Sequence, residues 1–218
     1  MKRLFRNPVV FLVVLLCATG ARSQAQHAFG LAGEYLFNMK AAENGNLGLR
    51  LSYDRVLNDH WTLRGMVGGM GGGQVRVYTA VPLPAYAGLP NDTVRSDERE
   101  RYFHLTVGAR RYVLGGAFSK GGAYVHLGVH LGFWSFTAET EAYDNTRYTI
   151  PALGPTEDDL MLVLFPVGVG YEWRAGKLVP YAELAYMPGT TVGDAAELTQ
   201  GFGITVGLRF PFGEGEGK

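Results

Sequence analysis

Apolar and polar residues alternate along most of the chain with a period of two, which is the period of a β-strand rather than of a helix. The clearest example is GFGITVGLRFPF, residues 201–212, where every second residue from Phe202 onward is apolar. The segment NLGLRLSYDR, residues 46–55, repeats the pattern. The alternation predicts an all-β protein in which each strand has one apolar face and one face of small or polar residues.

Applied to the whole chain, this period predicts eight strands of unusual length. They span residues 27–39, 46–56, 61–79, 99–113, 122–137, 160–174, 178–188 and 201–212. Strands of soluble sheets typically have about five or six residues, whereas a tilted strand needs about nine to eleven to cross a bilayer. The lengths therefore favour membrane-spanning strands.

The predicted connections alternate between short and long. Short links follow the second, fourth and sixth strands, while residues 80–98, 138–159 and 189–200 form longer links. This sorting is typical of an antiparallel up-and-down transmembrane β-barrel with short periplasmic turns and longer extracellular loops. We expect an eight-stranded barrel of this class, or a ten-stranded one if a long loop contains a hairpin.

The composition of the two faces indicates which one points inward. Small residues mixed with a few charges of both signs suit the narrow interior of an eight-stranded barrel. We predict a lumen charge network of Glu34, Arg50, Arg64, Arg110, Glu172, Glu183 and Arg209. The apolar face would then contact lipid, with the interface aromatics Trp61, Tyr171, Trp173 and Phe212 beside the short turns. The reverse arrangement would make a secreted lipocalin-like ligand-binding barrel.

The N-terminal segment has the organisation of a secretory signal peptide, with three basic residues before ten apolar residues at 9–18. Ten apolar residues are too few to span a bilayer as a helix. We expect cleavage after Ala25, or alternatively after Ser23. The predicted division is a removed signal peptide 1–25, an outer-membrane barrel 26–212 and a short flexible tail 213–218.

Charge and glycine content exclude some functions. The leader holds four of the 20 basic residues and no acidic one, so 16 basic and 20 acidic residues leave the mature chain a net charge of −4. That balance gives no reason to expect nucleic acid binding. The glycine-rich run GMVGGMGGGQV, residues 65–75, is no phosphate loop, because Gln74 stands where a P-loop requires lysine. We interpret it as part of a strand and expect no cofactor.

Two histidines are weak candidates for a metal site. His104 and His130 would lie roughly opposite each other on the lumen face, but zinc normally needs three or four ligands. His126 lies four residues from His130, about 13 Å along a strand. A catalytic site is not expected either, since no serine lies within two residues of these histidines and Ser135 has no histidine beside it.

Two segments carry a family resemblance: GITVGLRFPF at the C-terminal end and HLTVGARRYV at residues 104–113. With them, the chain resembles the small bacterial outer-membrane β-barrel (porin-like) domain family, in particular its Bacteroidota members. The resemblance implies a closing strand that ends on an aromatic residue read by the barrel-insertion machinery. Phe212 would serve here, although GEGEGK follows it.

These observations predict a protein of the bacterial outer membrane with a structural or surface-interaction role and no catalysis. The expected partners are outer-membrane lipid and lipopolysaccharide, the barrel-insertion machinery and an unknown extracellular partner bound by the long loops. The alternatives are a narrow passive pore, a lipid A-modifying barrel enzyme and the secreted lipocalin-like barrel.

Overall fold

The computed structural model describes residues 26–37, 46–118, 121–151, 156–193 and 197–213. The described residues form twelve β-strands and one 3₁₀ helix, η1 (Pro84–Tyr86). The strands are β1 (His27–Phe37), β2 (Asn46–Asn58), β3 (Trp61–Pro82), β4 (Asp92–Tyr112), β5 (Gly122–Thr140), β6 (Tyr148–Thr149), β7 (Glu157–Leu164), β8 (Val167–Glu172), β9 (Val179–Tyr186), β10 (Gly189–Val192), β11 (Leu198–Thr199) and β12 (Phe202–Phe212). In this part of the chain no helix has the length and hydrophobicity to cross a membrane.

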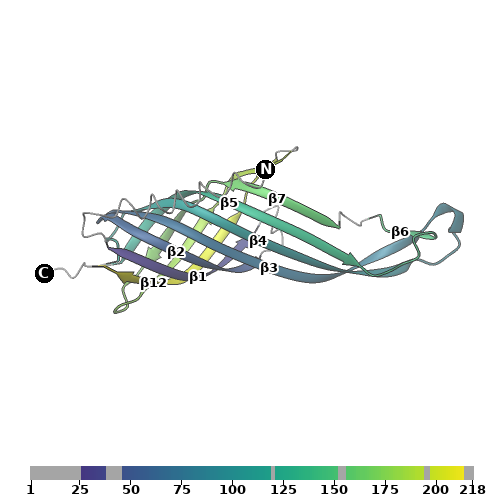
Figure 1. Ribbon diagram of the computed structural model, residues 1–218, viewed down its shortest axis with the longest axis horizontal. Helices are drawn as coiled ribbons and strands as arrows, with labels where there is room; N and C mark the ends of the chain where they lie inside the picture. The colour runs from purple at the N-terminus through teal and green to yellow at the C-terminus, as the bar shows by residue number, and fades with distance from the viewer. Residues whose placement is uncertain (1–25, 38–45, 119–120, 152–155, 194–196, 214–218) are drawn as a thin grey trace, which may run out of the picture.

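The strands close into one antiparallel barrel (Figure 1). β1 pairs with β2 on one side and with β12 on the other, so the first and last strands join. β7 and β8 follow each other along β5 and form the sixth wall strand. β9 pairs with β8 and β12, while β10 pairs with β7, so these two form the seventh. The predicted eight-stranded antiparallel barrel is confirmed.

Two prolines lie at breaks in the wall strands. The predicted strand 160–174 is interrupted at Pro166, between β7 and β8. The predicted strand 178–188 is β9, which ends at Tyr186, and after Pro188 the wall continues as β10 within the predicted loop 189–200. Proline has no N–H to give to the ladder, so the pairing lapses there. The barrel still continues on both sides of each break.

The apolar face points outward over the whole barrel. Large apolar side chains on the outside are substantially exposed, such as Leu47 at 72% and Phe29 at 58%. Polar side chains on the alternate positions are buried inside, such as Glu34 at 2%. This is the orientation of a barrel surrounded by lipid and the opposite of a lipocalin.

A long β-ribbon extends beyond the barrel at one end, as Figure 1 shows. β3 and β4 remain paired from Trp61 and Arg111 up to Ala80 and Asp92. The predicted loop 80–98 is therefore wrong in its bounds: residues 80–82 end β3, residues 92–98 begin β4, and the loop proper is the link 83–91 that contains η1. The error has a physical cause, because buried positions of the ribbon such as Ser96 and Glu98 are polar, so the apolar alternation disappears.

The second predicted loop, 138–159, is also partly strand. β5 continues to Thr140, β7 begins at Glu157, and β6 pairs with the end of β3 at Val81 and Pro82. Around that pairing Ala80, Val94 and Ile150 form a small buried cluster, covered by Tyr78, Tyr143 and Tyr148. The far end of the ribbon thus has an apolar core of its own.

The glycine-rich run lies within β3, as predicted. Gly68 faces the interior, where an added Cβ would come within 2.2 Å of His104 Nε2. Gly69 faces outward, and its added Cβ would meet nothing closer than 3.4 Å. The predicted signal peptide 1–25 and residues 214–218 of the predicted tail lie outside the described residues, so both stay predictions.

Candidate functional site

A compact ionic cluster lies inside the barrel, built on Asp54 of β2, Arg64 of β3 and Arg110 of β4. Asp54 Oδ1 lies 2.6 Å from Arg110 Nη2 and 3.4 Å from Arg64 Nε, while Asp54 Oδ2 lies 3.3 Å from Arg209 Nε. Arg64 Nη1 also lies 2.7 Å from Glu183 Oε1. Alternation places these residues on the inner face of their strands, and barrel closure brings them together.

Glu183 connects Arg50 to the arginines that contact Asp54. Its Oε2 accepts a 2.6 Å hydrogen bond from Arg50 Nη2, and its Oε1 lies 3.1 Å from Arg209 Nη2. Arg209 also pairs with Glu172, and Arg50 Nη1 lies 3.9 Å from Glu34 Oε2. The structure therefore brings all seven residues of the predicted lumen network into one connected group.

Sequence reasoning missed three members of this cluster. Asp54 contacts three arginines, and its place on the same face as Arg50 was a usable signal. Tyr124 donates a 2.8 Å hydrogen bond to Glu183, and the guanidinium carbon of Arg209 lies 3.6 Å from the ring centroid of Tyr181. Tyr124 and Tyr181 are hard to assign to the interior from the sequence, because a tyrosine side chain is also common on the lipid-facing side of a barrel near the interface.

The cluster is electrically balanced and almost fully buried. Its arginines are Arg50, Arg64, Arg110 and Arg209, and its acids are Glu34, Asp54, Glu172 and Glu183. None of these eight side chains is more than 9% exposed. A buried charge is tolerated only when a partner compensates it, and four cations against four anions meet that requirement.

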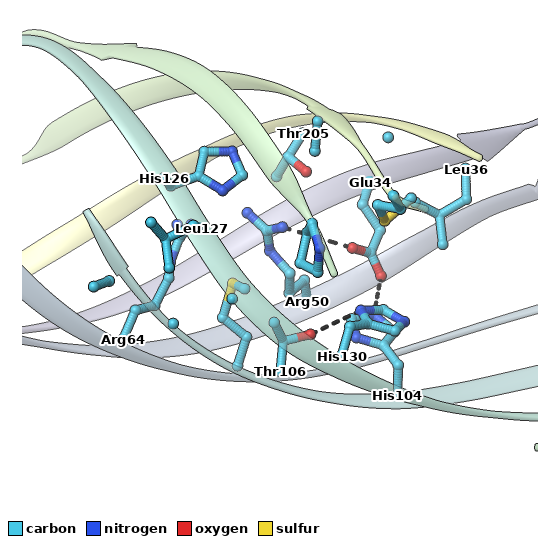
Figure 2. Close-up of a pocket in the computed structure, with 18 residues that line it drawn as sticks. Glu34, Leu36, Arg50, Arg64, His104, Thr106, His126, Leu127, His130 and Thr205 are labelled. Carbon is cyan, nitrogen blue, oxygen red and sulfur yellow. Dashed lines mark hydrogen bonds and ion pairs between the residues drawn. The ribbon is translucent and has the colours of Figure 1, made fainter. Parts of the chain in front are cut away.

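A small cavity adjoins this cluster, and Figure 2 shows Arg50, Arg64 and Glu34 of the cluster around it together with His104 and His130. Its volume is about 40 Å³, and its lining includes Glu34, Arg50, His104, Thr106 and His130. A single water needs roughly 10–15 Å³ of such volume. The cavity can therefore hold a few waters but no acyl chain or sugar.

His104 and His130, the predicted metal candidates, lie against each other beside this cavity. Their rings stack with centroids 4.6 Å apart. His104 Nε2 lies 2.5 Å from Glu34 Oε1, while His130 contacts Thr106 Oγ1 at 2.8 Å and the Tyr102 hydroxyl at 2.5 Å. Both ring nitrogens of His130 are thus engaged.

The surroundings of the two histidines do not complete a metal site. Among the described residues no group of three or more His, Cys, Asp or Glu side chains is placed to hold a metal ion. Thr106 is hydrogen-bonded to a histidine, as a nucleophile would be. It lines the cavity of about 40 Å³, which has room for a few waters.

The predicted interface aromatics lie at the barrel end where the chain makes its short turns. Trp61 pairs in register with Arg111, whose guanidinium carbon lies 5.7 Å from the centroid of the Trp61 ring system. Tyr171 stacks on Trp173, and Phe212 stacks on His27 and Phe29. All four aromatics are 38–54% exposed. Their position fits a membrane–water interface.

The ribbon contains a second polar cluster, centred on Glu98, which is only 3% exposed. Its carboxylate accepts hydrogen bonds from the Tyr78 hydroxyl at 2.5 Å and from Gln74 Nε2 at 3.1 Å, and it lies 3.0 Å from Arg76 Nε. The hydrogen bond to Glu98 raises the pKa of Tyr78, and burial adds to the effect. These contacts fasten β3 to β4 beyond the barrel.

Solved structures of bacterial outer-membrane proteins share this fold. Neisserial surface protein A matches with a TM-score of 0.50 and 10% identity over 87% of this chain and 98% of its own. A major outer membrane protein from Thermus thermophilus matches with a TM-score of 0.50 and 11% identity over 86% and 99%. Ail of Yersinia pestis matches with a TM-score of 0.47 and 13% identity over 86% and 97%.

The similarity is one of fold. No protein-family model matches the sequence, and no curated protein matches it. The comparisons agree with the outer-membrane barrel part of the predicted resemblance and do not bear on its Bacteroidota part.

Proposed function

We propose that this chain is a non-catalytic protein of the bacterial outer membrane whose barrel is a closed anchor and whose ribbon is a surface for interaction outside the cell. The outward apolar face and the fold shared with outer-membrane proteins support the location. By the usual orientation of such barrels, the short turns lie in the periplasm and the ribbon outside. Export through the predicted signal peptide and insertion by the barrel-insertion machinery belong to the same proposal.

The ribbon is the observation that carries the proposed role. About ten residues of β3 suffice to cross a bilayer, yet β3 has 22 and β4 has 21. The excess is held in shape by the Glu98 cluster and by the small core of Ala80, Val94 and Ile150. A segment that only linked two strands would need neither, and rigid scaffolds commonly carry binding on such projections.

The interior argues against the pore as the main alternative. Buried, mutually paired arginines and acids occupy the interior, and the adjoining cavity measures about 40 Å³. We expect the purified protein to give no steady ion conductance in planar lipid bilayers. Regular open channels in the wild-type protein would overturn the closed-anchor part of the proposal.

A shortened ribbon tests the interaction role. Val75 pairs with Asp97, so replacing residues 76–96 by Asn-Gly closes the hairpin with a two-residue turn in register. We expect cells that express this variant to settle together less, or to bind less to immobilised extracellular-matrix proteins, than cells with the wild type. A shift in gel mobility on boiling verifies that the variant barrel is folded. Equal settling and equal matrix binding by folded variant and wild type would refute the role.

A further inference from the structure

The outer surface changes sharply from apolar to charged where β4 leaves the barrel. Phe103 on β4 is paired with Phe133 on β5, which in turn is paired with Met161 on β7. These outward side chains form the last apolar row on β4, β5 and β7, with Phe103 51% and Phe133 44% exposed, while β3 carries the exposed Val75 and Val77 further along the ribbon. The next outward residues on β4 are Arg101 and Arg99, and both are exposed.

These two arginines have no partner among the described residues. No ion pair involves Arg99 or Arg101, although the Glu98 cluster on the opposite face of the same strand is fully paired. On the β3 side they are opposite Gly71 and Gly73, which have no side chain to cover the guanidinium groups. On the β5 side they are opposite Ser135 and Thr137.

Of the acidic residues on this surface, Asp97 lies two residues from Arg99 on β4, whereas Asp159 and Glu157 lie on β7. Asp159 is paired with Ser135, and Glu157 with Thr137, so each acid is two strands from the nearest arginine. Neighbouring strands are about 4.8 Å apart, which separates the backbones of arginine and acid by roughly 10 Å. Asp97 and Glu139 also face outward, further along the ribbon. The β3 side of Arg99 and Arg101 is therefore cationic and open.

We propose that Arg99 and Arg101 bind the phosphate groups of lipid A in the outer leaflet. A guanidinium is planar and forms paired hydrogen bonds with phosphate. Here two of them stand directly above an apolar row, at the height where a phosphorylated lipid has its head group. Phe103 and Leu47, which is 72% exposed, provide the apolar surface below for its acyl chains. The choice of lipid A over phospholipid rests on the proposed function, which places the ribbon end outside.

The test compares lipids retained by the purified full-length mature barrel in phosphatidylcholine nanodiscs, measured by native mass spectrometry. The probes are bisphosphorylated lipid A, dephosphorylated lipid A and phosphatidylglycerol. We expect the wild type to retain the bisphosphorylated form at least about tenfold better than the other two, and the variant R99Q/R101Q to lose that preference. Heat-modifiable gel mobility verifies folding of each variant.

Arg95 provides a matched control. It lies on the same strand and the same outward face, is exposed and has no ion pair in the described part of the chain, but it is four residues, about 13 Å, further from the apolar row. R95Q should keep lipid A retention within about twofold of the wild type.

Three results would overturn the proposal. R99Q/R101Q could retain lipid A as the wild type does, or R95Q could lose as much as the double variant. Equal retention of phosphatidylglycerol would make the ligand an ordinary anionic phospholipid. Because the measurement uses purified protein, it is independent of the adhesion experiment on the ribbon, and either proposal can fail while the other holds.

Discussion

Arg110 donates a 2.6 Å hydrogen bond from Nη2 to Asp54 Oδ1, and neither side chain is exposed to solvent. The two residues come from β4 and β2, with β3 between them, so the contact crosses the barrel interior rather than joining neighbouring strands. Asp54 thereby links the wall strands from within. The stability of the barrel depends on the balance of this interior charge.

Removing the charge of Asp54 tests that balance. D54N leaves three arginines short of a carboxylate, and breaking a buried ion pair typically costs about 3–5 kcal/mol. We expect a loss of that size in the free energy of unfolding, measured by urea titration of the protein folded in lipid vesicles. The control D59N, in an exposed turn, should change it by about 0.5 kcal/mol or less. Equal effects of the two substitutions would refute the role given to Asp54.

The glycine-rich run offers a pair of neighbouring substitutions with opposite expectations. G68A places a methyl group 2.2 Å from His104 Nε2 and 2.8 Å from Glu34 Oε1, so the contact between these two side chains must shift. Overpacking of this kind costs about 1–3 kcal/mol. G69A points outward, with the nearest atom at 3.4 Å, and should be neutral or stabilising by about 0.5 kcal/mol. The same urea titration measures both, and the reverse order would contradict the assignment of faces.

The Glu98 cluster should stabilise the ribbon without affecting the barrel. E98Q loses the ion pair with Arg76 and weakens the hydrogen bond from Tyr78. A lost hydrogen bond to a charged group costs about 1.5–3 kcal/mol, here in local stability only. We expect about tenfold faster protease cleavage within residues 76–96 and an unchanged urea midpoint for the barrel. A shifted midpoint would show that ribbon and barrel unfold together.

The ionisation of Tyr78 makes the stability of the ribbon depend on pH. Its pKa is raised above the ordinary value of about 10 by the hydrogen bond to Glu98. A raised pKa means that the stabilisation is complete below pH 10 and is lost as the pH rises through the folded-state value. Ultraviolet difference titration of the wild type against Y78F should therefore show a tyrosine that ionises late. In the E98Q background this tyrosine should ionise earlier, and an unchanged titration would contradict the contact.

The wall of the barrel could be predicted from the sequence because lipid and a packed interior impose opposite demands on alternate residues. Residues 201–212 show this most clearly, since β12 is bounded by lipid on one face and by the ionic cluster on the other. The ribbon escaped prediction because buried positions on β4, such as Ser96 and Glu98, are polar. DTVRSDERER, at the start of β4, has Val94 as its single apolar residue and therefore resembles a loop.

The interior could be predicted as a set of residues but not as a geometry. Alternation places Arg64, Arg110 and Glu183 inside, yet which carboxylate meets which guanidinium depends on the stagger of the closed barrel. The breaks at Pro166 and Pro188 follow from proline chemistry, but the apolar residues around them conceal both. The sequence predicts His104 and His130 roughly opposite each other, and the register between β4 and β5 sets them diagonally, with His104 opposite Gly132 and His130 opposite Thr106.

The most direct test of the account is the gel mobility of the protein in isolated outer membranes, with and without boiling in detergent. A closed transmembrane barrel resists detergent until it is heated, so we expect the chain in the outer-membrane fraction and a clear mobility shift on boiling. A protein found in the soluble fraction, with the same mobility before and after boiling, would contradict the outward apolar face and with it the closed membrane anchor.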